Sequence, residues 1–377
     1  MQNPDILKVD LQDRSYNIVI GSNLIKNLGQ FIPSLIKNTS VIIITDQNVA
    51  DFHLTKLVHA LDAEKLAYSV VTLPPGESTK RFSHFQNIIS KILDKNPERS
   101  TSLIAFGGGV IGDLAGFAAS IILRGINYFQ IPTTLLAQVD SSVGGKTGVN
   151  SEHGKNLIGT FYQPKGVLID TSVLATLPKR ELLAGYAEVV KYGIIGDKKF
   201  FEWLEINGEA LIKGDEGLQK YAIMESCRAK AKIVNQDEKE TGNRALLNFG
   251  HTFGHALEAE MGYNSRLLHG EAVAIGMLLA FDLSVLMGFC AKEEATRVQK
   301  HFLSMGLPTQ LDDIFERNYD SEVLLDHMRR DKKVKNGQLN FILTRGVGNA
   351  FITSEVERDS VIEVLNRRAK NSIFPIE

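Results

Sequence analysis

The chain has 377 residues, 44% of them hydrophobic, and its 42 Lys and Arg residues nearly balance 44 Asp and Glu residues, for a formal net charge of −2. This length suggests two domains with substantial hydrophobic cores. The near-neutral charge argues against nucleic acid or a membrane surface as the main partner, because such partners favour strongly basic proteins.

The N-terminal segment predicts a pair of strands. Residues 7–20 alternate in character and contain β-branched side chains, which is typical of paired strands.

The chain begins MQNPDILKVD, with acidic residues where a signal peptide needs a basic region and an apolar block. Its two cysteines, Cys227 and Cys290, form no CxxC motif. We therefore expect a protein of the reducing cytoplasm, with both cysteines buried as small apolar residues.

Strands and helices alternate over residues 41–170. Apolar and β-branched runs predict strands at 41–45, 68–73, 128–132 and 167–170, and SLIAFGGG at 102–109 predicts a strand that runs into a loop. Amphipathic patterns predict helices at about 54–66, 81–95 and 112–122. This alternation indicates a doubly wound, Rossmann-like parallel sheet. The first of these strands ends at Asp46 and Asn48, so we expect its carboxyl end to meet a ligand.

Two glycine-rich stretches follow strands of this sheet, GGGVIGD at 107–113 and a longer stretch at 124–159. The longer stretch contains Arg124, Lys146 and Lys155. Glycines let backbone N–H groups approach phosphate oxygens and lysines add charge, so we expect a site for a strongly anionic ligand. For the first stretch alone, a tight strand-to-helix turn is the alternative, with Asp113 merely complementing the helix dipole.

The pattern becomes helical after about residue 178. We therefore predict an α/β domain over 1–178 and a mainly α-helical domain over 179–377, with late strands only at 339–345 and 350–354. Residues 272–291 are long and apolar enough to span a bilayer. However, Asp282 lies in the middle of this stretch and no basic flank precedes it, so we expect a buried central helix.

Three histidines in the second half suggest a metal site. His251 and His255 are four residues apart and share one helix face, and His269 follows shortly before Glu271. The sequence HTFGH lacks the glutamate that a zinc protease needs beside its first histidine, so protease chemistry is not expected. Histidines satisfied at helix ends are the alternative. The pattern leaves open whether His255 is a ligand or a proton carrier.

Several charged residues lie within apolar stretches or repeat at helical spacing. Glu188 and Lys191 are three apart within AGYAEVVKYG, where the small and apolar flanks favour a cleft over a surface ion pair. Lys230 lies on an apolar helical stripe, so it either extends to the surface or is buried against an acid. Spacings of four place Arg244 and Asn248 on a polar face that starts at Glu240. The DKK sequence at 331–333 is most simply a solvated turn.

These motifs resemble, in order, those of the 3-dehydroquinate synthase family. The resemblance covers about residues 40–350 and rests on GGGVIGDLAGF, RGINYFQIPTTLLAQVDSSVGGKTGVN, GKNLIGTFYQP, AGYAEVVKYG, LNFGHTFGHALE and LLHGEAVAIGM. It implies an N-terminal NAD-binding domain and a C-terminal metal-binding domain. It also implies NAD and a divalent metal as cofactors, usually Zn²⁺ with Co²⁺ as a further possibility, and a sugar-phosphate substrate.

The resemblance implies roles for individual residues. The metal ligands would be Glu188, His251 and His269, and His255 would become a proton carrier. The catalytic groups would be His255, Lys191, Lys230 and Asp140. The residues that contact NAD would be Asp46, Asn48, Glu77, Lys80, Gly108, Gly109, Asp113, Thr133, Thr134, Lys146, Lys155 and Thr176. The substrate-binding residues would be Arg124, Lys146, Asn156, Arg244, Asn248 and Lys333, with Lys332 as the alternative to Lys333.

The family's reaction explains these residue types. It converts 3-deoxy-D-arabino-heptulosonate 7-phosphate to 3-dehydroquinate and phosphate, with NAD regenerated in each turnover. Arg124 would reach the substrate site of a neighbouring subunit, so a homodimer is implied. A related cyclase with another sugar phosphate, a metal-dependent alcohol dehydrogenase and a non-catalytic nucleotide-binding module are the competing interpretations. Arg244 favours the 3-dehydroquinate synthase reaction over that of another cyclase, because a substrate carboxylate calls for a cation that forms two parallel hydrogen bonds.

Overall fold

The computed structural model describes residues 4–33, 40–263, 265–315, 319–330, 334–335 and 338–369. Internal contacts divide the chain into two compact units. Unit 1 comprises Met1–Leu182 and Gly214–Lys239, and unit 2 comprises Leu183–Lys213 and Glu240–Glu377. The chain therefore returns to unit 1 after first entering unit 2. The boundary near residue 178 remains a prediction about the two domains.

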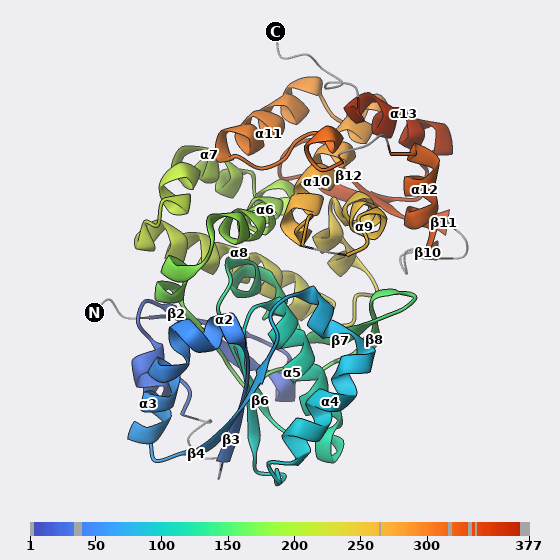
Figure 1. The fold of residues 1–377 in the computed structure, drawn as a ribbon. Helices are drawn as coiled ribbons and strands as arrows, with labels where there is room; N and C mark the ends of the chain where they lie inside the picture. The colour runs from blue at the N-terminus through green and yellow to red at the C-terminus, as the bar shows by residue number, and fades with distance from the viewer. Residues whose placement is uncertain are drawn as a thin grey trace. The chain divides into compact units, whose positions relative to one another are not determined.

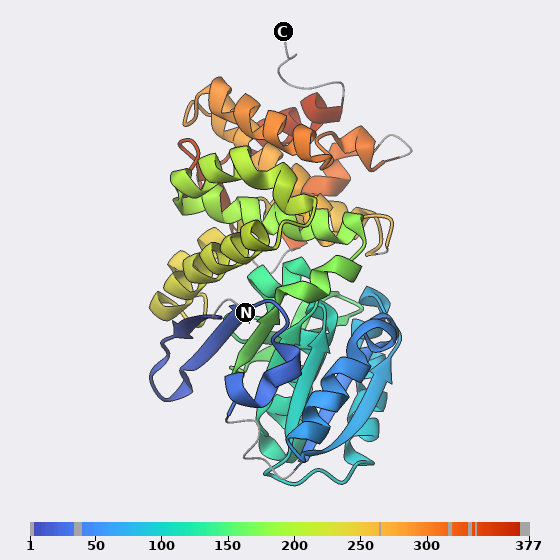
Figure 2. The ribbon, with the colours of Figure 1, turned by 90° about the vertical axis from the view of Figure 1, so that its left-hand side faces the viewer.

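Unit 1 is built on a seven-stranded sheet in the order β1-β2-β9-β6-β5-β3-β4 (Figures 1 and 2). Its strands are β1 (Asp5–Val9), β2 (Tyr16–Gly21), β3 (Ser40–Asp46), β4 (Ala67–Leu73), β5 (Ser102–Gly107), β6 (Tyr128–Pro132) and β9 (Val167–Asp170). Only β1 and β2 pair antiparallel, and they form a hairpin at one edge. The predicted doubly wound sheet and its strands are thus confirmed.

The sheet is covered on both faces, which explains its continuous apolar strands. The main helices of this unit are α3 (Thr55–Ala63), α4 (Phe82–Leu93), α5 (Gly109–Ile121) and α8 (Glu216–Gln236). In β3, Val41 and Ile43 join the core that includes α3, whereas Ile42 and Ile44 join the core that includes α4 and α5. Figure 1 shows α3 on one side of the sheet and α4 and α5 on the other.

Two features of unit 1 were not predicted from the sequence. The glycine-rich stretch after residue 145, to which the sequence assigned no element, is an antiparallel hairpin of β7 (Lys146–Ser151) and β8 (Gly154–Phe161). Helix α8 packs against the β1–β2 hairpin, with the Lys220 ammonium 3.0 Å from the Asp5 carboxylate. Both features depend on contacts between distant segments, which local periodicity does not reveal.

Unit 2 is mainly helical, as predicted. Its helices are most of α6 (Lys179–Gly196), then α7 (Lys198–Ile212), α9 (His251–Glu260), α10 (His269–Leu286), α11 (Lys292–Met305), α12 (Ser321–Arg330) and α13 (Arg358–Ala369). The predicted late strands appear as the antiparallel pair β12 (Phe341–Thr344) and β13 (Ala350–Thr353). Two further short strands are β10 (Val334–Lys335) and β11 (Gln338–Leu339).

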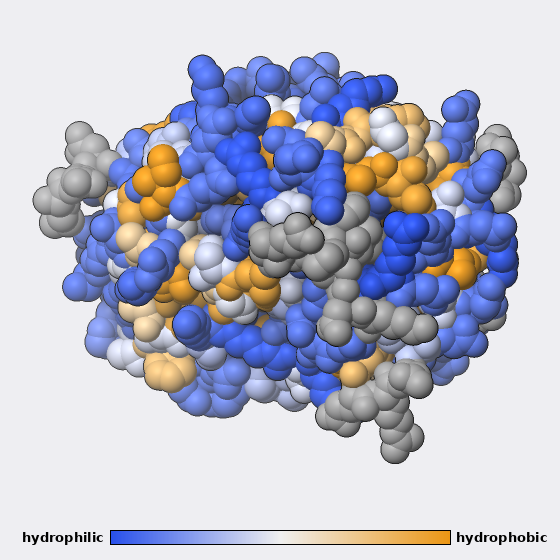
Figure 3. Space-filling view, turned by 90° about the horizontal axis from the view of Figure 1, so that it is seen from above, coloured by the Kyte–Doolittle hydropathy of each residue, from blue (hydrophilic) through white to orange (hydrophobic). Residues whose placement is uncertain are grey.

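Helix α10 is the buried central helix predicted for this region. It is long and apolar enough to cross a membrane by length and composition, yet 78% of it is buried. Its one acidic residue beyond the first turn, Asp282, accepts a hydrogen bond from Nε of Arg368 at 2.5 Å, in a pair that is almost fully buried. The face in Figure 3 is mainly hydrophilic, with apolar side chains in separate patches.

Glycines let three helices of unit 2 approach one another closely. A Cβ on Gly270 of α10 would lie 1.9 Å from the carbonyl oxygen of Ala184 on α6. A Cβ on Gly276 of α10 would lie 2.1 Å from the carbonyl oxygen of Gly250, which precedes α9 and has φ of +79°. Since real Cβ atoms cannot approach backbone so closely, only glycine fits these contacts. The contacts fix the positions of the helices that carry the predicted metal ligands.

Candidate metal centre and nucleotide-binding edge

The three predicted metal ligands converge in unit 2. Glu188 lies on α6, and His251 and His269 are the first residues of α9 and α10. Oε1 of Glu188 lies 3.6 Å from Nε2 of His251 and 3.6 Å from Nε2 of His269. The donor atoms of a tetrahedral zinc site, with bonds of about 2.0–2.2 Å, are separated by about 3.4 Å. The observed donor types and spacings therefore fit a divalent metal.

The histidine rings are oriented through their other nitrogens. Nδ1 of His251 lies 3.2 Å from the carbonyl oxygen of Phe249. A carbonyl oxygen can only accept a hydrogen bond, so Nδ1 is the donor in this contact, and Nε2 is the nitrogen that a metal would use. Burial by itself lowers the pKa of His269, but Glu258 and Glu188 outweigh that effect and raise it to about 9 in the metal-free protein.

His255 lies beside this centre. Its ring centroid is 5.4 Å from that of His251 and 6.1 Å from that of His269. It belongs to a second group of converging donor atoms, with Glu258 and His269, rather than to the group around Glu188. Glu258 is a residue that the sequence analysis overlooked, although its position seven residues after His251 places it on the same side of α9.

Lys191 and Arg244 are buried cations of unit 2. The Lys191 ammonium pairs with Oε2 of Glu188, and both side chains are about 1% exposed, so this is not a surface ion pair. Arg244 is fully buried.

The polar face expected from Glu240 onward does not lie on one helix, because within residues 240–248 only Asn243–Asn248 are helical, in a 3-10 helix. A hydrogen bond of 2.7 Å from Asn248 to Glu240 nevertheless brings the ends of that segment together.

The carboxyl edge of the sheet in unit 1 holds many of the residues predicted to bind NAD. Strand β4 lies on one side of β3 in the sheet and β5 lies on the other side. The order of the strands therefore reverses between β3 and β5, which makes this the topological switch point. Asp46 ends β3 and accepts a hydrogen bond of 3.1 Å from the backbone N–H of Val49. Gly108 and Gly109 lie at the N-terminus of α5, a suitable place for a phosphate.

Further residues predicted to contact NAD lie at this edge. The Thr133 hydroxyl is buried and has no hydrogen-bond partner within the described residues. A Cβ on Gly108 would lie 3.0 Å from a methyl carbon of Thr134, so the two segments are in close contact. Thr176 ends a 3-10 helix, and its hydroxyl lies 2.8 Å from Nε2 of His53. Burial raises the pKa of Asp46, against two backbone N–H contacts that lower it.

A hydrogen-bond network joins predicted residues from three segments of unit 1. The buried Lys80 donates to Asp113 and to Asn156, each at 2.5 Å. Glu77 accepts a hydrogen bond of 2.6 Å from Asn150 and lies 3.7 Å from the Lys155 ammonium. Burial raises the pKa of Asp113, although Lys80 opposes that shift.

Lys230 is buried against an acid, which settles the choice left open by its sequence pattern. Its ammonium donates to the backbone carbonyl of Asp140 at 2.7 Å and to the Asp140 carboxylate at 2.9 Å. Lys230 is 6% exposed. Both residues belong to unit 1, since α8 returns to it.

Arg124 and Lys146 are exposed in unit 1. Leu123, Arg124 and Gly125 have consecutive positive φ angles of 50°, 65° and 117°. Such angles are unfavourable for leucine and arginine, so this turn holds local strain. Lys332 and Lys333, predicted as alternative substrate contacts, lie outside the described residues.

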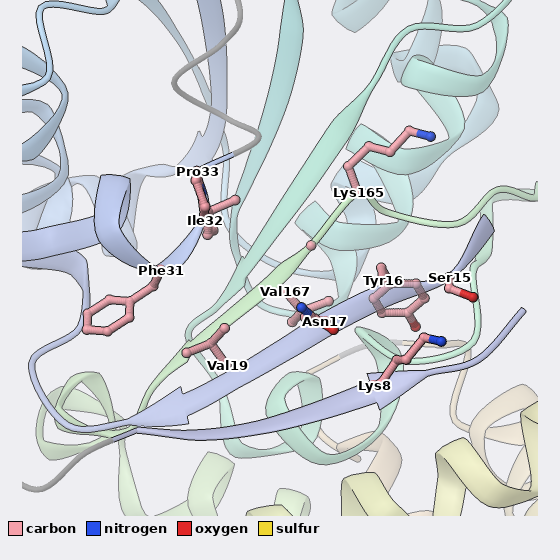
Figure 4. A pocket seen from close by; sticks show the side chains of 11 residues that line it. Lys8, Ser15, Tyr16, Asn17, Val19, Phe31, Ile32, Pro33, Lys165 and Val167 are labelled. Atoms are coloured by element: carbon pink, nitrogen blue, oxygen red, sulfur yellow. The ribbon is translucent and has the colours of Figure 1, made fainter. Parts of the chain in front are cut away.

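A separate pocket in unit 1 contains none of the predicted site residues (Figure 4). It lies beside β2, with Phe31 and Ile32 toward one end and Lys8 and Lys165 toward the other. Its two lysines, Lys8 and Lys165, are exposed, in contrast to the buried Lys191 of the metal centre.

Comparison with known proteins gives consistent matches over most of the chain. Residues 70–184 match the family model for the N-terminal part of 3-dehydroquinate synthase, and residues 185–334 match the model for its C-terminal part. The 3-dehydroquinate synthase of Rhodospirillum rubrum is 53% identical over 361 residues, which cover 96% of this chain and 94% of that protein. The 3-dehydroquinate synthase of Ruegeria pomeroyi is 54% identical over 357 residues, covering 95% and 96%.

Solved structures show the same fold. A 2-epi-5-epi-valiolone synthase from Streptomyces hygroscopicus, with NAD⁺ and Zn²⁺ bound, gives a TM-score of 0.86 at 27% identity and covers 96% of this chain and 99% of that one. A 2-deoxy-scyllo-inosose synthase with carbaglucose-6-phosphate, NAD⁺ and Co²⁺ gives a TM-score of 0.86 at 26% identity, with the same coverage of both chains. A butanol dehydrogenase from Thermotoga maritima shares the fold alone. Its TM-score is 0.66 at 17% identity, over 94% of this chain and 96% of that one.

Proposed function

Because the chain belongs to the 3-dehydroquinate synthase family, we propose that it converts 3-deoxy-D-arabino-heptulosonate 7-phosphate into 3-dehydroquinate and phosphate. It would thus be a carbon–oxygen lyase of the shikimate pathway, which leads to chorismate and the aromatic amino acids. The observation that carries the proposal is the convergence of buried Glu188 on Nε2 of both His251 and His269, beside the buried Lys191.

In the proposed reaction the C5 hydroxyl is oxidised to a ketone, which acidifies the neighbouring C–H bond and allows phosphate to leave. The C5 ketone is then reduced, the ring opens, and an aldol addition closes the carbocycle. When bound, NAD supplies a hydride acceptor that is regenerated in each turnover, and the metal supplies Lewis acidity toward the hydroxyl. The residues for the metal are Glu188, His251 and His269, whose donor spacing fits a divalent ion.

The protein's own side chains would bind, orient and move protons. Lys191 and Lys230 are buried cations able to stabilise an alkoxide, and Asp140 holds the Lys230 ammonium. His255, whose ring centroid lies 5.4 Å from that of His251, would exchange a proton with the substrate. Arg244 would bind the substrate carboxylate through two parallel hydrogen bonds, with Asn248 nearby in sequence.

We assign NAD to the carboxyl edge of the sheet in unit 1. The residues proposed to hold it are Asp46, Asn48, Glu77, Lys80, Gly108, Gly109, Asp113, Thr133, Thr134, Lys146, Lys155 and Thr176. Support comes from the switch point between β3 and β5, the helix N-terminus at Gly109 and the buried Thr133 hydroxyl. Lys146, Asn156 and Arg124 are proposed to bind the substrate phosphate, and Lys333 or Lys332 to contact the substrate.

The enzyme is proposed to act as a homodimer in the cytoplasm. Arg124 is exposed and lies beside Ile121 and Leu123, which are 45% and 39% exposed, so this turn offers an apolar surface to a second copy. The arginine would then reach the partner's substrate phosphate. The two cysteines are free and buried, as suits a reducing compartment.

One assay tests the function. The purified protein is incubated with the heptulosonate phosphate, NAD and Zn²⁺, and phosphate, dehydroquinate and NADH are measured. We expect equal amounts of phosphate and dehydroquinate without net NADH. Accumulating NADH without phosphate release would identify an alcohol dehydrogenase instead. Turnover of a hexose 6-phosphate but not of the heptulosonate phosphate would identify a different sugar-phosphate cyclase.

A further inference from the structure

His269 has a carboxylate at each of its ring nitrogens. Its Nε2 lies 3.6 Å from Oε1 of Glu188, in the proposed metal centre. Its Nδ1 lies 3.3 Å from Oε2 of Glu258, within hydrogen-bonding distance. Glu258 lies on α9, one turn after His255 and two turns after His251, so the same helix supplies one metal ligand and contacts another.

The burial of Glu258 needs an explanation. This residue is 2% exposed, and a buried carboxylate is costly unless it is paired and hydrogen-bonded. The neighbouring glutamate on the same helix, Glu260, is exposed and pairs with His327 at 3.1 Å. Helix α9 thus carries two glutamate–histidine pairs, one at the surface and one against a proposed metal ligand.

The two ligand histidines are oriented in the same way but by different acceptors. His251 donates from Nδ1 to the neutral carbonyl oxygen of Phe249, at 3.2 Å. His269 faces a carboxylate with its Nδ1. A negatively charged acceptor holds the Nδ1–H tautomer more strongly than a carbonyl and makes Nε2 a better donor to a cation.

We propose that Glu258 is a positioning residue of the metal centre, which accepts a hydrogen bond from Nδ1 of His269 and directs Nε2 of that ring toward the metal. The proposal rests on the assignment of Glu188, His251 and His269 as ligands. A second ion held by His255, Glu258 and His269 is the competing interpretation, because these donor atoms also converge. It would require His269 to bind ions through both nitrogens, and hence to lose its Nδ1 proton.

The test compares Glu258→Gln with the matched control Glu260→Gln on the same helix. The Zn²⁺ affinity of each metal-free protein is measured by competition with a chromophoric chelator, together with ion stoichiometry, the visible absorption of the Co²⁺ form, and the melting temperature without metal. Glu258→Gln removes the negative charge of the acceptor, and mutation of such an orienting partner typically lowers metal affinity by about 10–100-fold. We expect a loss of this size and an altered Co²⁺ spectrum for Glu258→Gln, with neither change for Glu260→Gln.

The outcomes are distinguishable. Wild-type affinity and an unchanged Co²⁺ spectrum in Glu258→Gln overturn the proposal, even if the metal-free protein melts earlier. Two ions in the wild type and one in the variant overturn it in favour of the second ion site. If Glu258→Gln does not fold, Glu258→Asp decides by the same criteria, because its carboxylate is withdrawn by one methylene. Full metal content in His251→Ala would instead overturn the ligand assignment itself.

Discussion

His251 and His255 lie one helical turn apart on α9, and their alanine variants separate metal binding from proton transfer. We expect His251→Ala to lose bound Zn²⁺ and activity together, because it removes one of three ligands. We expect His255→Ala to keep stoichiometric Zn²⁺ but to turn over about 10²–10⁴-fold more slowly, the usual contribution of a positioned acid–base group. Metal analysis and steady-state kinetics on both variants make the test. Loss of the metal in His255→Ala would make His255 a ligand.

His301 makes the stability of unit 2 depend on pH. It is buried among aromatic rings and hydrogen-bonds to the Tyr186 hydroxyl at 3.0 Å, and burial lowers its pKa to about 4. The folded protein therefore binds fewer protons than the unfolded chain between pH of about 4 and 6.5. The stabilisation is complete above this window and is lost as the pH falls through it, by about 3 kcal/mol at most.

The substitution His301→Gln tests this effect while keeping a polar partner for Tyr186. Urea unfolding at pH 7 and pH 5 gives the free energy of unfolding of both proteins. We expect the wild type to lose more stability than the variant on acidification, because the other titrating groups are common to both. Equal losses would show that His301 does not cause the dependence.

The residue types of the metal centre were predictable, since two histidines and a glutamate in these motifs indicate a divalent metal. Glu258 was not identified, because a glutamate near the end of an amphipathic helix is normally a solvated residue. Its contact with His269 depends on how α9 and α10 pack. Similarly, Lys230 could be placed on an apolar stripe from the sequence, but its pairing with Asp140 joins segments 90 residues apart.

At the scale of elements, the contact between α6 and α10 is sensitive to a single methyl group. The Cβ of Gly270→Ala would lie 1.9 Å from the backbone oxygen of Ala184, which no side-chain rotation can relieve. We expect the helices to separate and the free energy of unfolding to fall by about 1–3 kcal/mol. Zn²⁺ affinity should fall as well, because Glu188 and His269 lie on these two helices.

A second glycine provides the control. Gly196, at the end of α6, has no atom within 4 Å of its Cβ position, so Gly196→Ala should leave stability and Zn²⁺ affinity near those of the wild type. Chemical unfolding and chelator competition measure both properties. If Gly270→Ala behaves like Gly196→Ala, the close approach of α6 and α10 does not position the ligands.

The elements themselves were predictable where one pattern dominated. The strands of the parallel sheet are continuous apolar runs, and α10 is apolar on every side because it is buried. The β7–β8 hairpin was missed because its glycines and lysines weaken the strand pattern. The segment at 240–248 was misread, since residues four apart also meet across a turn and a 3-10 helix.

At the scale of the whole molecule, subunit exchange tests whether Arg124 acts across a dimer. A charge-assisted contact to a desolvated phosphate is worth about 1.5–3 kcal/mol, so Arg124→Ala should weaken substrate binding by about 10–100-fold and leave NAD binding almost unchanged. Arg124→Ala and Lys146→Ala are mixed at a substrate concentration too low for either variant to turn over by itself. Activity should then reappear, because some mixed dimers hold one site with both residues intact. If subunits exchange and activity stays absent, Arg124 does not act on the partner's site.

The amino-acid sequence by itself indicated the alternation of strands and helices and the glycines that follow the strands. It also indicated the residue types suited to a metal, a dinucleotide and a phosphate. These features are local, because periodicity and turn chemistry operate over a few residues. The convergence of Glu188, His251 and His269 from three helices, the burial of Lys191 and Lys230, and the contact of Glu258 with His269 depend instead on long-range packing. Around the metal centre, these contacts arise where glycines let α6, α9 and α10 approach, and no local pattern encodes which helices meet.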